Sequence, residues 1–258
     1  MEAQITVAVR RLITLLTDFG TADGYVGEMK GVLLSLSPDA DVVDITHDIR
    51  PQDVDHARLT LARVWRRFPR GTVHVAVVDP GVGSARAALA VASDGRFLVG
   101  PDNGVLSPAL LVGGVRAVEL SVPPSASTTF HGRDVFAPAA AALARGESLD
   151  ALGAEARQPV IRRTPEPARR ADGSLEGEVI MIDRFGNAVT NLVALHGGTV
   201  DAAGQRIAVR RTYAEVAPSA PVAVVGSTGF VEVAVRDGDA SRTLGLTRGS
   251  RVVLRTGE

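Results

Sequence analysis

The chain has no cysteine and no long apolar run, and each absence excludes a class of protein. Without cysteine there can be no disulfide, no thiolate nucleophile and no zinc–thiolate site. No uninterrupted apolar run reaches the roughly 18 residues of a membrane-spanning helix, and the start of the chain lacks the order of a secretion signal. We therefore expect a cytoplasmic protein that does not enter a membrane.

An excess of charge of one sign is also missing. The net charge is −1 and the pI is about 6.5, which disfavours a nucleic-acid partner. Lys30 is the only lysine among 28 Lys and Arg residues, a bias that indicates a GC-rich bacterial genome. No pair of histidines has the spacing of a metal site, so we expect no metal.

Length and composition are those of a globular protein. The 258 residues are 45% apolar and 22% charged, close to ordinary usage, and can bury the cores of two domains. In residues 1–160, apolar strand-like runs at 12–17, 42–45 and 72–78 alternate with helical spacing at 25–36 and 53–68. This alternation predicts an α/β domain with a Rossmann-like, mostly parallel sheet, to which residues 88–92 and 97–100 add a hairpin.

The second half of the chain has a different pattern. Residues 161–176 are rich in Pro and Arg with little periodicity, as expected of a linker. Residues 177–258 contain short strand-like runs separated by glycines, which predicts a small all-β barrel domain. The strands are expected at 179–183, 189–193, 206–211, 221–225, 230–235 and 250–255.

Three side chains could act together on a water molecule. Asp79 and Arg86 flank a glycine-rich turn after a buried strand, where α/β sheets bind ligands. His131 lies in a polar segment that packing explains poorly, whereas a structural role is expected for the other histidines. If the three side chains meet, they can polarise one water. The competing interpretation is a simple turn. The other histidines are His47, His56, His74 and His196.

The glycines of that turn do not form a dinucleotide fingerprint. Arg86 stands where the third glycine of G-x-G-x-x-G would be, and strand-like residues follow where a helix should begin. We expect Gly81 and Gly83 to allow a tight turn and a close approach to a ligand.

Other polar loops could bind a ligand. Asp18 and Asp23 follow the first strand, where a carboxylate can accept ribose hydroxyls or bind a cation; alternatively, they cap the turn and the next helix. The amide of Asn187 can donate to and accept from the edge of an adenine, and the Asp183 carboxylate can accept hydrogen bonds from an ammonium group. The turn that contains Ser227 suits a carboxylate. Tight turns between strands explain these last two loops comparably well.

The order of these segments along the chain resembles the S-adenosylmethionine hydroxide adenosyltransferase family, which is related to fluorinase and chlorinase. The resemblance covers almost the whole chain. It is carried by Thr17-Asp18-Phe19-Gly20, Val78-Asp79-Pro80-Gly81-Val82-Gly83, Gly100-Pro101-Asp102-Asn103-Gly104, Phe130-His131-Gly132-Arg133-Asp134, Asp183-Arg184-Phe185-Gly186-Asn187 and Gly226-Ser227-Thr228-Gly229.

The resemblance implies that S-adenosylmethionine (SAM) and water give adenosine and methionine without a cofactor. It also implies a homotrimer, with each active site between the large domain of one subunit and the small domain of its neighbour. Asp79, Arg86 and His131 match the residues around the reacting water. The implied substrate contacts are Asp18 for ribose, Phe130, Phe185, Asn187 and Tyr213 around the nucleoside, and Asp23, Asp183 and Ser227 at the methionine end.

Two departures separate this chain from the halogenating relatives. They carry an uncharged residue at the position of Asp79, whereas a carboxylate there would repel a halide. Gln52 stands where the fluorinating relatives carry a large aromatic residue. Water is therefore favoured as the nucleophile. The alternatives are a halogenase of the same fold and a SAM- or nucleoside-binding protein without turnover.

Overall fold

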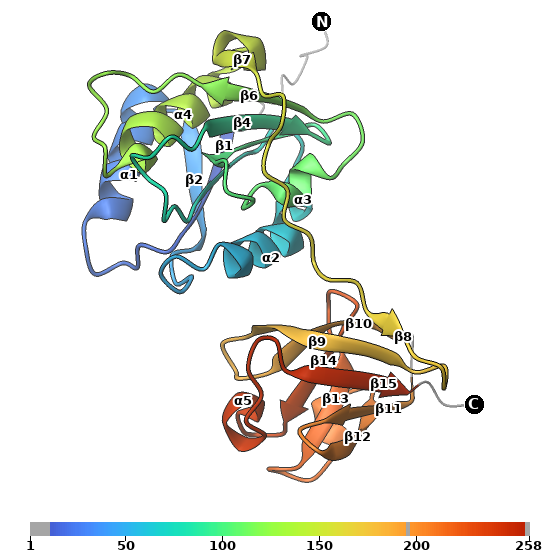
Figure 1. Ribbon diagram of the computed structural model, residues 1–258. Helices are drawn as coiled ribbons and strands as arrows, with labels where there is room; N and C mark the ends of the chain where they lie inside the picture. The colour runs from blue at the N-terminus through green and yellow to red at the C-terminus, as the bar shows by residue number, and fades with distance from the viewer. Residues whose placement is uncertain (1–10, 195–196, 256–258) are drawn as a thin grey trace, which may run out of the picture. The chain divides into compact units, whose positions relative to one another are not determined.

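The protein is described from a computed structural model, which covers residues 11–194 and 197–255. His196 and the first ten residues lie outside this described part. The chain divides into one unit that ends at Arg162 and a second that begins at Arg163 (Figure 1).

The first unit is built on a seven-stranded mixed sheet with the order β2-β1-β3-β5-β4-β6-β7. Strands β2, β1, β3 and β5 are parallel neighbours, while β4, β6 and β7 are joined by antiparallel pairings. The strands are β1 Arg11–Thr17, β2 Ala40–Thr46, β3 Val73–Val77, β4 Ala88–Ser93, β5 Arg96–Pro101, β6 Arg116–Leu120 and β7 Gly153–Glu155.

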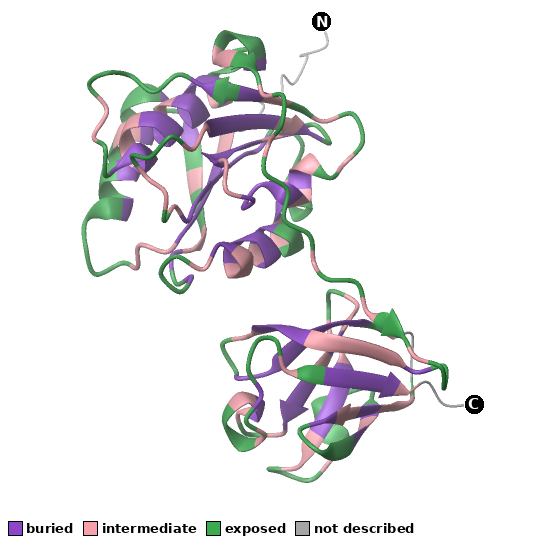
Figure 2. Cartoon of the chain, in the orientation of Figure 1, coloured by how far each residue is buried: buried purple, intermediate pink, exposed green. Residues whose placement is uncertain are grey.

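Helices cover both faces of this sheet, so its central strand β3 is buried along its whole length and is mostly apolar. In β3, Val73, Val75 and Val77 pack toward α1 and α4, whereas Ala76 and the following Val78 pack toward α2 and α3. Figure 2 shows the buried strands between these layers. The helices are α1 Tyr25–Leu36, α2 Val54–Val64, α3 Ser107–Leu110 and α4 Ala137–Arg145.

Local signals set the helix ends. Helix α4 has a proline in its first turn and ends at Gly146, whose φ of +96° is the left-handed conformation that favours glycine. The expected helix over residues 53–68 ends earlier, because after Val64 the chain continues as a 3-10 turn, Trp65–Arg67, and then turns extended at Phe68. A short π-helix, Gly132–Phe136, precedes α4, and a 3-10 turn, Leu149–Ala151, precedes β7.

The second unit is a β-barrel. Its strands follow the order β10-β14-β13-β12-β11-β15-β9, and a further pairing of β10 with β9 closes the ring. A 3-10 turn, Tyr213–Glu215, and a short helix, α5 Ala240–Thr243, lie between strands. The strands are β9 Leu175–Ile182, β10 Ala188–Val193, β11 Thr199–Ala202, β12 Gln205–Arg210, β13 Pro221–Val225, β14 Phe230–Val235 and β15 Arg251–Arg255.

Some strands were not expected from the sequence. Within residues 161–176, strand β8 (Ala168–Arg169) pairs with the start of β9 through a turn at Gly173, whose φ is +81°. Short strands β6, β7 and β11 also lack a periodic pattern long enough to detect. Their partners in the sheets, rather than their own sequences, make them strands.

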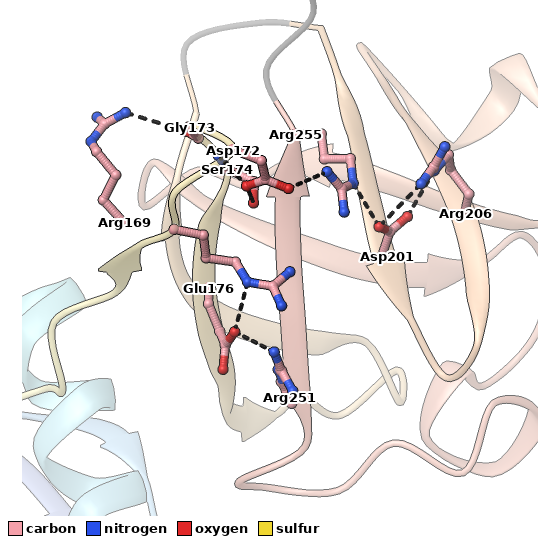
Figure 3. A network of polar contacts seen from close by, with 10 residues as sticks. Arg169, Asp172, Gly173, Ser174, Glu176, Asp201, Arg206, Arg251 and Arg255 are labelled. Carbon is pink, nitrogen blue, oxygen red and sulfur yellow. Dashed lines mark hydrogen bonds and ion pairs between the residues drawn. The ribbon is translucent and has the colours of Figure 1, made fainter.

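Ion pairs link neighbouring strands on the outside of the barrel (Figure 3). Arg255 lies between Asp172 and Asp201, and Asp201 also binds Arg206. Glu176 is contacted in the same way by Arg170 and Arg251. Such exposed pairs each contribute little to stability, but together they connect β9, β15, β11 and β12.

Candidate active site

Asp79 and Arg86 form the central ion pair of the site. The buried strand β3 ends at Val77, so Asp79 lies just beyond it, at the carboxyl edge of the parallel strands. Arg86 Nε donates to Asp79 Oδ1 over 2.9 Å, and Arg86 Nη2 contacts Oδ2. The side chains are only 6% and 10% exposed, so this two-point contact is held in a largely dry environment.

His131 completes the cluster. Arg86 Nη2 lies 2.9 Å from His131 Nδ1. Because a guanidinium can only donate, Nδ1 must accept, and the ring proton therefore sits on Nε2. Burial, followed by the nearby Arg86 charge, lowers the pKa of His131, which favours this neutral form. The sequence left open whether Asp79, Arg86 and His131 meet, and in the structure Arg86 contacts both of the others.

The glycine-rich turn is tight, as expected, and it also packs against the loop that leads to His131. A Cβ on Gly83, whose φ is +75°, would lie 2.3 Å from the backbone oxygen of Thr128. Only glycine therefore allows this close approach of the two loops. Ser84 stabilises the turn by donating its hydroxyl to the carbonyl of Gly81 over 2.6 Å. Gly83 thus allows the loops of Arg86 and His131 to pack together.

Asp18 lies in the loop after β1, at the same sheet edge. Its Oδ2 accepts a 2.7 Å hydrogen bond from the backbone N–H of Gln52, which has a φ of +67°. Burial raises the pKa of Asp18, and the Gln52 hydrogen bond opposes that rise. Asp23 is exposed, and α1 begins at Tyr25 with Gly24 as its N-cap residue and without a side-chain cap. The capping role considered for Asp23 is therefore absent.

Phe130 belongs to an aromatic group rather than to an open surface. It is 9% exposed and packs edge-on against Phe19 and Tyr25, with centroid distances of 5.9 and 5.3 Å. The Arg133 guanidinium lies 5.1 Å from its ring centroid. This arrangement supports the segment that presents His131, and the half-exposed Tyr25 is the member of the group most open to solvent.

In the barrel unit, Asp183 and Asn187 hold one another across the turn between β9 and β10. Asp183 Oδ1 accepts from the backbone N–H groups of Phe185 and Asn187, each over 2.9 Å. Asn187 Nδ2 donates to Asp183 Oδ2 over 3.0 Å. The same turn projects Phe185, which at 76% exposed has the greatest exposure among the large apolar side chains described. An aromatic ring held out in this way suits stacking on a planar ligand.

Tyr213 and Ser227 lie elsewhere on the barrel loops. Tyr213 is 42% exposed, and its hydroxyl donates to Glu232 Oε2 over 3.0 Å. Burial, then the nearby carboxylates of Glu232 and Asp183, raise the pKa of Tyr213 to about 12. Ser227 is exposed in the turn from Gly226 to Gly229, which the Gly229 N–H closes on the Gly226 carbonyl.

Glu232 is the residue of this group that the sequence analysis missed. It is half-buried in β14, and a Cβ on Gly226 would lie 1.9 Å from its Oε1. Glu232 therefore lies between Tyr213 and the turn of Ser227. A usable signal existed, since Glu232 is a charged residue at the centre of the otherwise apolar run 230–235.

Side chains that could bind a metal ion do not cluster in the part of the chain that the structure describes. Among residues 11–194 and 197–255, no group of three or more His, Cys, Asp or Glu side chains could hold a metal ion. Across the same residues, no helix has both the length and the apolar character needed to span a membrane.

Comparison with known proteins identifies the family. The family model of the SAM hydroxide adenosyltransferase N-terminal domain matches residues 13–153, and that of the C-terminal domain matches residues 177–253. The chain belongs to the SAM hydroxide adenosyltransferase family. This confirms the resemblance seen in the ordered sequence motifs.

Curated members of the family include close relatives of this chain. It is 45% identical to the (R)-S-adenosyl-L-methionine hydrolase of Thermus thermophilus, covering 95% of this chain and 99% of the relative. It is 42% identical to the protein of the same name from Salinispora tropica, with 95% and 98% covered. The fluorinase of Actinopolyspora mzabensis is more distant, at 30% identity with 76% and 75% covered.

Solved structures support the same fold. An uncharacterized conserved protein from Thermotoga maritima superposes with a TM-score of 0.85 at 32% identity, covering 94% of this chain and 99% of that one. A conserved hypothetical protein from Thermus thermophilus gives a TM-score of 0.81 at 44% identity, with 96% and 100% covered. The expected combination of an α/β domain and a β-barrel domain is thereby confirmed.

Proposed function

We propose that this protein hydrolyses S-adenosyl-L-methionine to adenosine and L-methionine. The observation that carries the proposal is the buried Asp79 carboxylate, held at two points by Arg86 beside a neutral His131. The names of the close relatives support it, because they are hydrolases of (R)-S-adenosyl-L-methionine. The more distant fluorinases make halogenation the less favoured alternative.

The proposed step is an in-line attack of water on C5′ of the substrate. The water oxygen bonds to C5′ while the C5′–S bond breaks. The electrons of the broken bond stay on sulfur, so the sulfonium becomes the neutral thioether of methionine. Full deprotonation of bulk water at neutral pH costs roughly 12 kcal/mol, so proton transfer during attack is preferable. A positioned base avoids much of that cost.

The hydrogen bonds divide the roles within the cluster. Arg86 occupies one acceptor site on each oxygen of Asp79, which leaves further lone pairs for a water proton. His131 Nδ1 is already accepting from Arg86, so its Nε2–H is a donor that can orient the water oxygen. We therefore assign Asp79 as the proton acceptor, Arg86 as its anchor and His131 as the orienting donor.

The remaining residues are proposed to bind the substrate. Asp18 would accept ribose hydroxyls, and Asn187 would read the adenine edge while Phe185 and Tyr213 stack on the base. Asp23, Asp183 and Ser227 would contact the ammonium and carboxylate of the methionine end, with Phe130 supporting the pocket wall. The locked Asp183–Asn187 pair and the exposed ring of Phe185 favour this division.

We further propose a homotrimer whose active sites combine the large domain of one subunit with the barrel of another. Mixing two impaired proteins tests this arrangement. Asp79→Asn and Phe185→Ala subunits are exchanged by mild denaturation and dilution and assayed at a SAM concentration well below the KM of Phe185→Ala. Activity should exceed the average of the two parents, because some sites then carry neither change. Light scattering gives the mass of the assembly. Mixtures no more active than that average would contradict shared sites.

The central experiment measures adenosine formed from SAM. Because the sulfonium is a stereocentre and the relatives are named for the (R) form, the separated epimers should be assayed, with (R) as the expected substrate. Heavy-oxygen water should label the adenosine 5′-hydroxyl.

The alternatives have their own tests. Excess chloride or fluoride should yield no halogenated nucleoside, and a chelator should leave the rate unchanged if no cofactor metal takes part. Absence of adenosine would overturn the proposal, and binding without turnover would indicate the non-catalytic alternative.

A cytoplasmic location, with no nucleic-acid or membrane partner, completes the proposal. The near-neutral composition supports this view.

A further inference from the structure

The turn Pro101-Asp102-Asn103-Gly104 is a sequence motif to which the proposed reaction gives no role. It follows β5, the parallel neighbour of β3, so it lies at the sheet edge where Asp79 is delivered. We propose that this turn is a positioning element in which Asn103 fixes the peptide that carries Asp79. The proposal rests on the proposed function.

Asn103 holds the chain immediately before Asp79. Its Nδ2 donates to the carbonyl of Val78 over 2.8 Å, and its Oδ1 accepts from the N–H of Val105 over 3.1 Å. Both ends of the amide are therefore engaged with backbone, which leaves the side chain no freedom to rotate away. Val78 is fully buried, so water cannot readily replace this bond.

Asp102 holds the chain immediately after Arg86. Its backbone N–H donates to the carbonyl of Ala87 over 2.9 Å. The same carbonyl accepts from Arg86 Nη1 over 3.2 Å. The turn thus contacts the residue before Asp79 and the residue after Arg86, and so sets where the two side chains meet. Small errors in such placement reduce turnover strongly.

The opposite side of the turn holds the end of the first unit. Asp102 Oδ1 accepts from the N–H of Val160 over 2.7 Å, and Arg162 Nε donates to the carbonyl of Asn103 over 2.8 Å. A Cβ on Gly104 would lie 2.4 Å from Arg162 Cγ, and the φ of Gly104 is +95°. Since the first unit ends at Arg162, this one turn contacts both the Asp79–Arg86 pair and the last residues of the first unit.

A comparison of two asparagines tests this role. Asn191 is a matched control in the barrel, because its Nδ2 donates to the carbonyl of Pro165 and its Oδ1 accepts from the N–H of Glu178. Asn103→Ala and Asn191→Ala should lower the melting temperature alike. Only Asn103→Ala should lower kcat, by about tenfold or more, with the KM for SAM changed less than about threefold.

A second measurement does not depend on turnover. In Asn103→Ala, Arg86 should sit less firmly against His131, so the His131 titration followed by NMR should rise toward the ordinary value of 6.5. In Asn191→Ala it should not move. If wild-type protein forms no adenosine, the proposed function fails while this titration still tests the positioning role.

The positioning role is overturned if Asn103→Ala keeps the wild-type kcat, or if its defect lies in KM alone. An unmoved His131 titration in that variant would also overturn it. If Asn103→Ala does not fold, Asn103→Asp is used in its place. This variant removes the donor to the Val78 carbonyl but keeps an acceptor for the Val105 N–H, and the same outcomes apply to it.

Discussion

The two units of the chain differ in how far they expose the groups assigned to function. In the first unit, Asp79, Arg86 and His131 are largely buried, and Arg86 binds both of the others. In the barrel, Phe185 and Ser227 are exposed. The groups assigned to chemistry are thus fixed in advance, whereas several groups assigned to binding present open surface.

This difference has a physical reason. A charge that must act on a reacting water is more effective when its neighbours already hold it and little solvent must reorganise. A binding surface gains its free energy when the ligand covers exposed apolar area, so it cannot be covered beforehand. Changes at Asp79, Arg86 and His131 should therefore alter turnover, and changes at the exposed barrel groups should alter affinity.

The sharpest test of this contrast is Asp79→Asn, which keeps the shape of the side chain and removes its charge. We expect kcat to fall by about 10²- to 10⁴-fold, because the proton acceptor is lost, with a much smaller change in KM. Steady-state adenosine formation measures both constants. Asp201→Asn is the control, since Asp201 also binds two arginines but lies on the outside of the barrel. Equal losses in kcat and affinity would contradict the assignment of Asp79.

The next largest effect is expected for Phe185→Ala. Loss of a stacking ring should weaken SAM binding by about 5- to 100-fold while kcat and stability stay near wild type, because the ring is 76% exposed. Calorimetry and thermal unfolding measure these quantities. Val193→Ala, which also changes an exposed apolar residue of the barrel, should have no effect on binding. A fall in kcat alone would break the contrast between the units.

Asn187→Ala should give an intermediate result. The variant should bind SAM roughly tenfold more weakly and lose about 1 kcal/mol of stability, because Asn187 is buried and donates to Asp183. Titration calorimetry and denaturant unfolding separate the two losses. Unchanged affinity with reduced stability would leave Asn187 as a structural turn residue and remove it from adenine recognition.

The smallest effect concerns pH. The pKa of His131 is lowered from 6.5, so the neutral form is the major one at pH 6.5 and above. We expect the decline of kcat at low pH to be centred below 6.5, where protonation of Nδ1 displaces the Arg86 hydrogen bond. A pH–rate profile checks this expectation. A decline centred at or above 6.5 would show that His131 is not held neutral by its surroundings.

Much of the first unit follows from local sequence signals. The strand of residues 72–78 is mostly apolar and buried on both faces, and Gly146 ends α4 in the left-handed conformation that its residue type favours. In contrast, β7 and β8 have only three and two residues, too few for a periodic pattern. Glu232 was missed because its neighbours Tyr213 and Gly226 come from other loops.

The sequence by itself determined which chemical groups the chain carries, in what order, and that Asp79 follows a buried strand. Ordered motifs were enough to indicate the family. Only the tertiary structure decided that Arg86 holds Asp79 at two points while donating to His131 Nδ1, and our proposal of Asp79 as the proton acceptor rests on these contacts. The reason is that residue types are local, whereas hydrogen-bond direction depends on atoms brought together from β3, its turn and a loop 45 residues beyond Arg86.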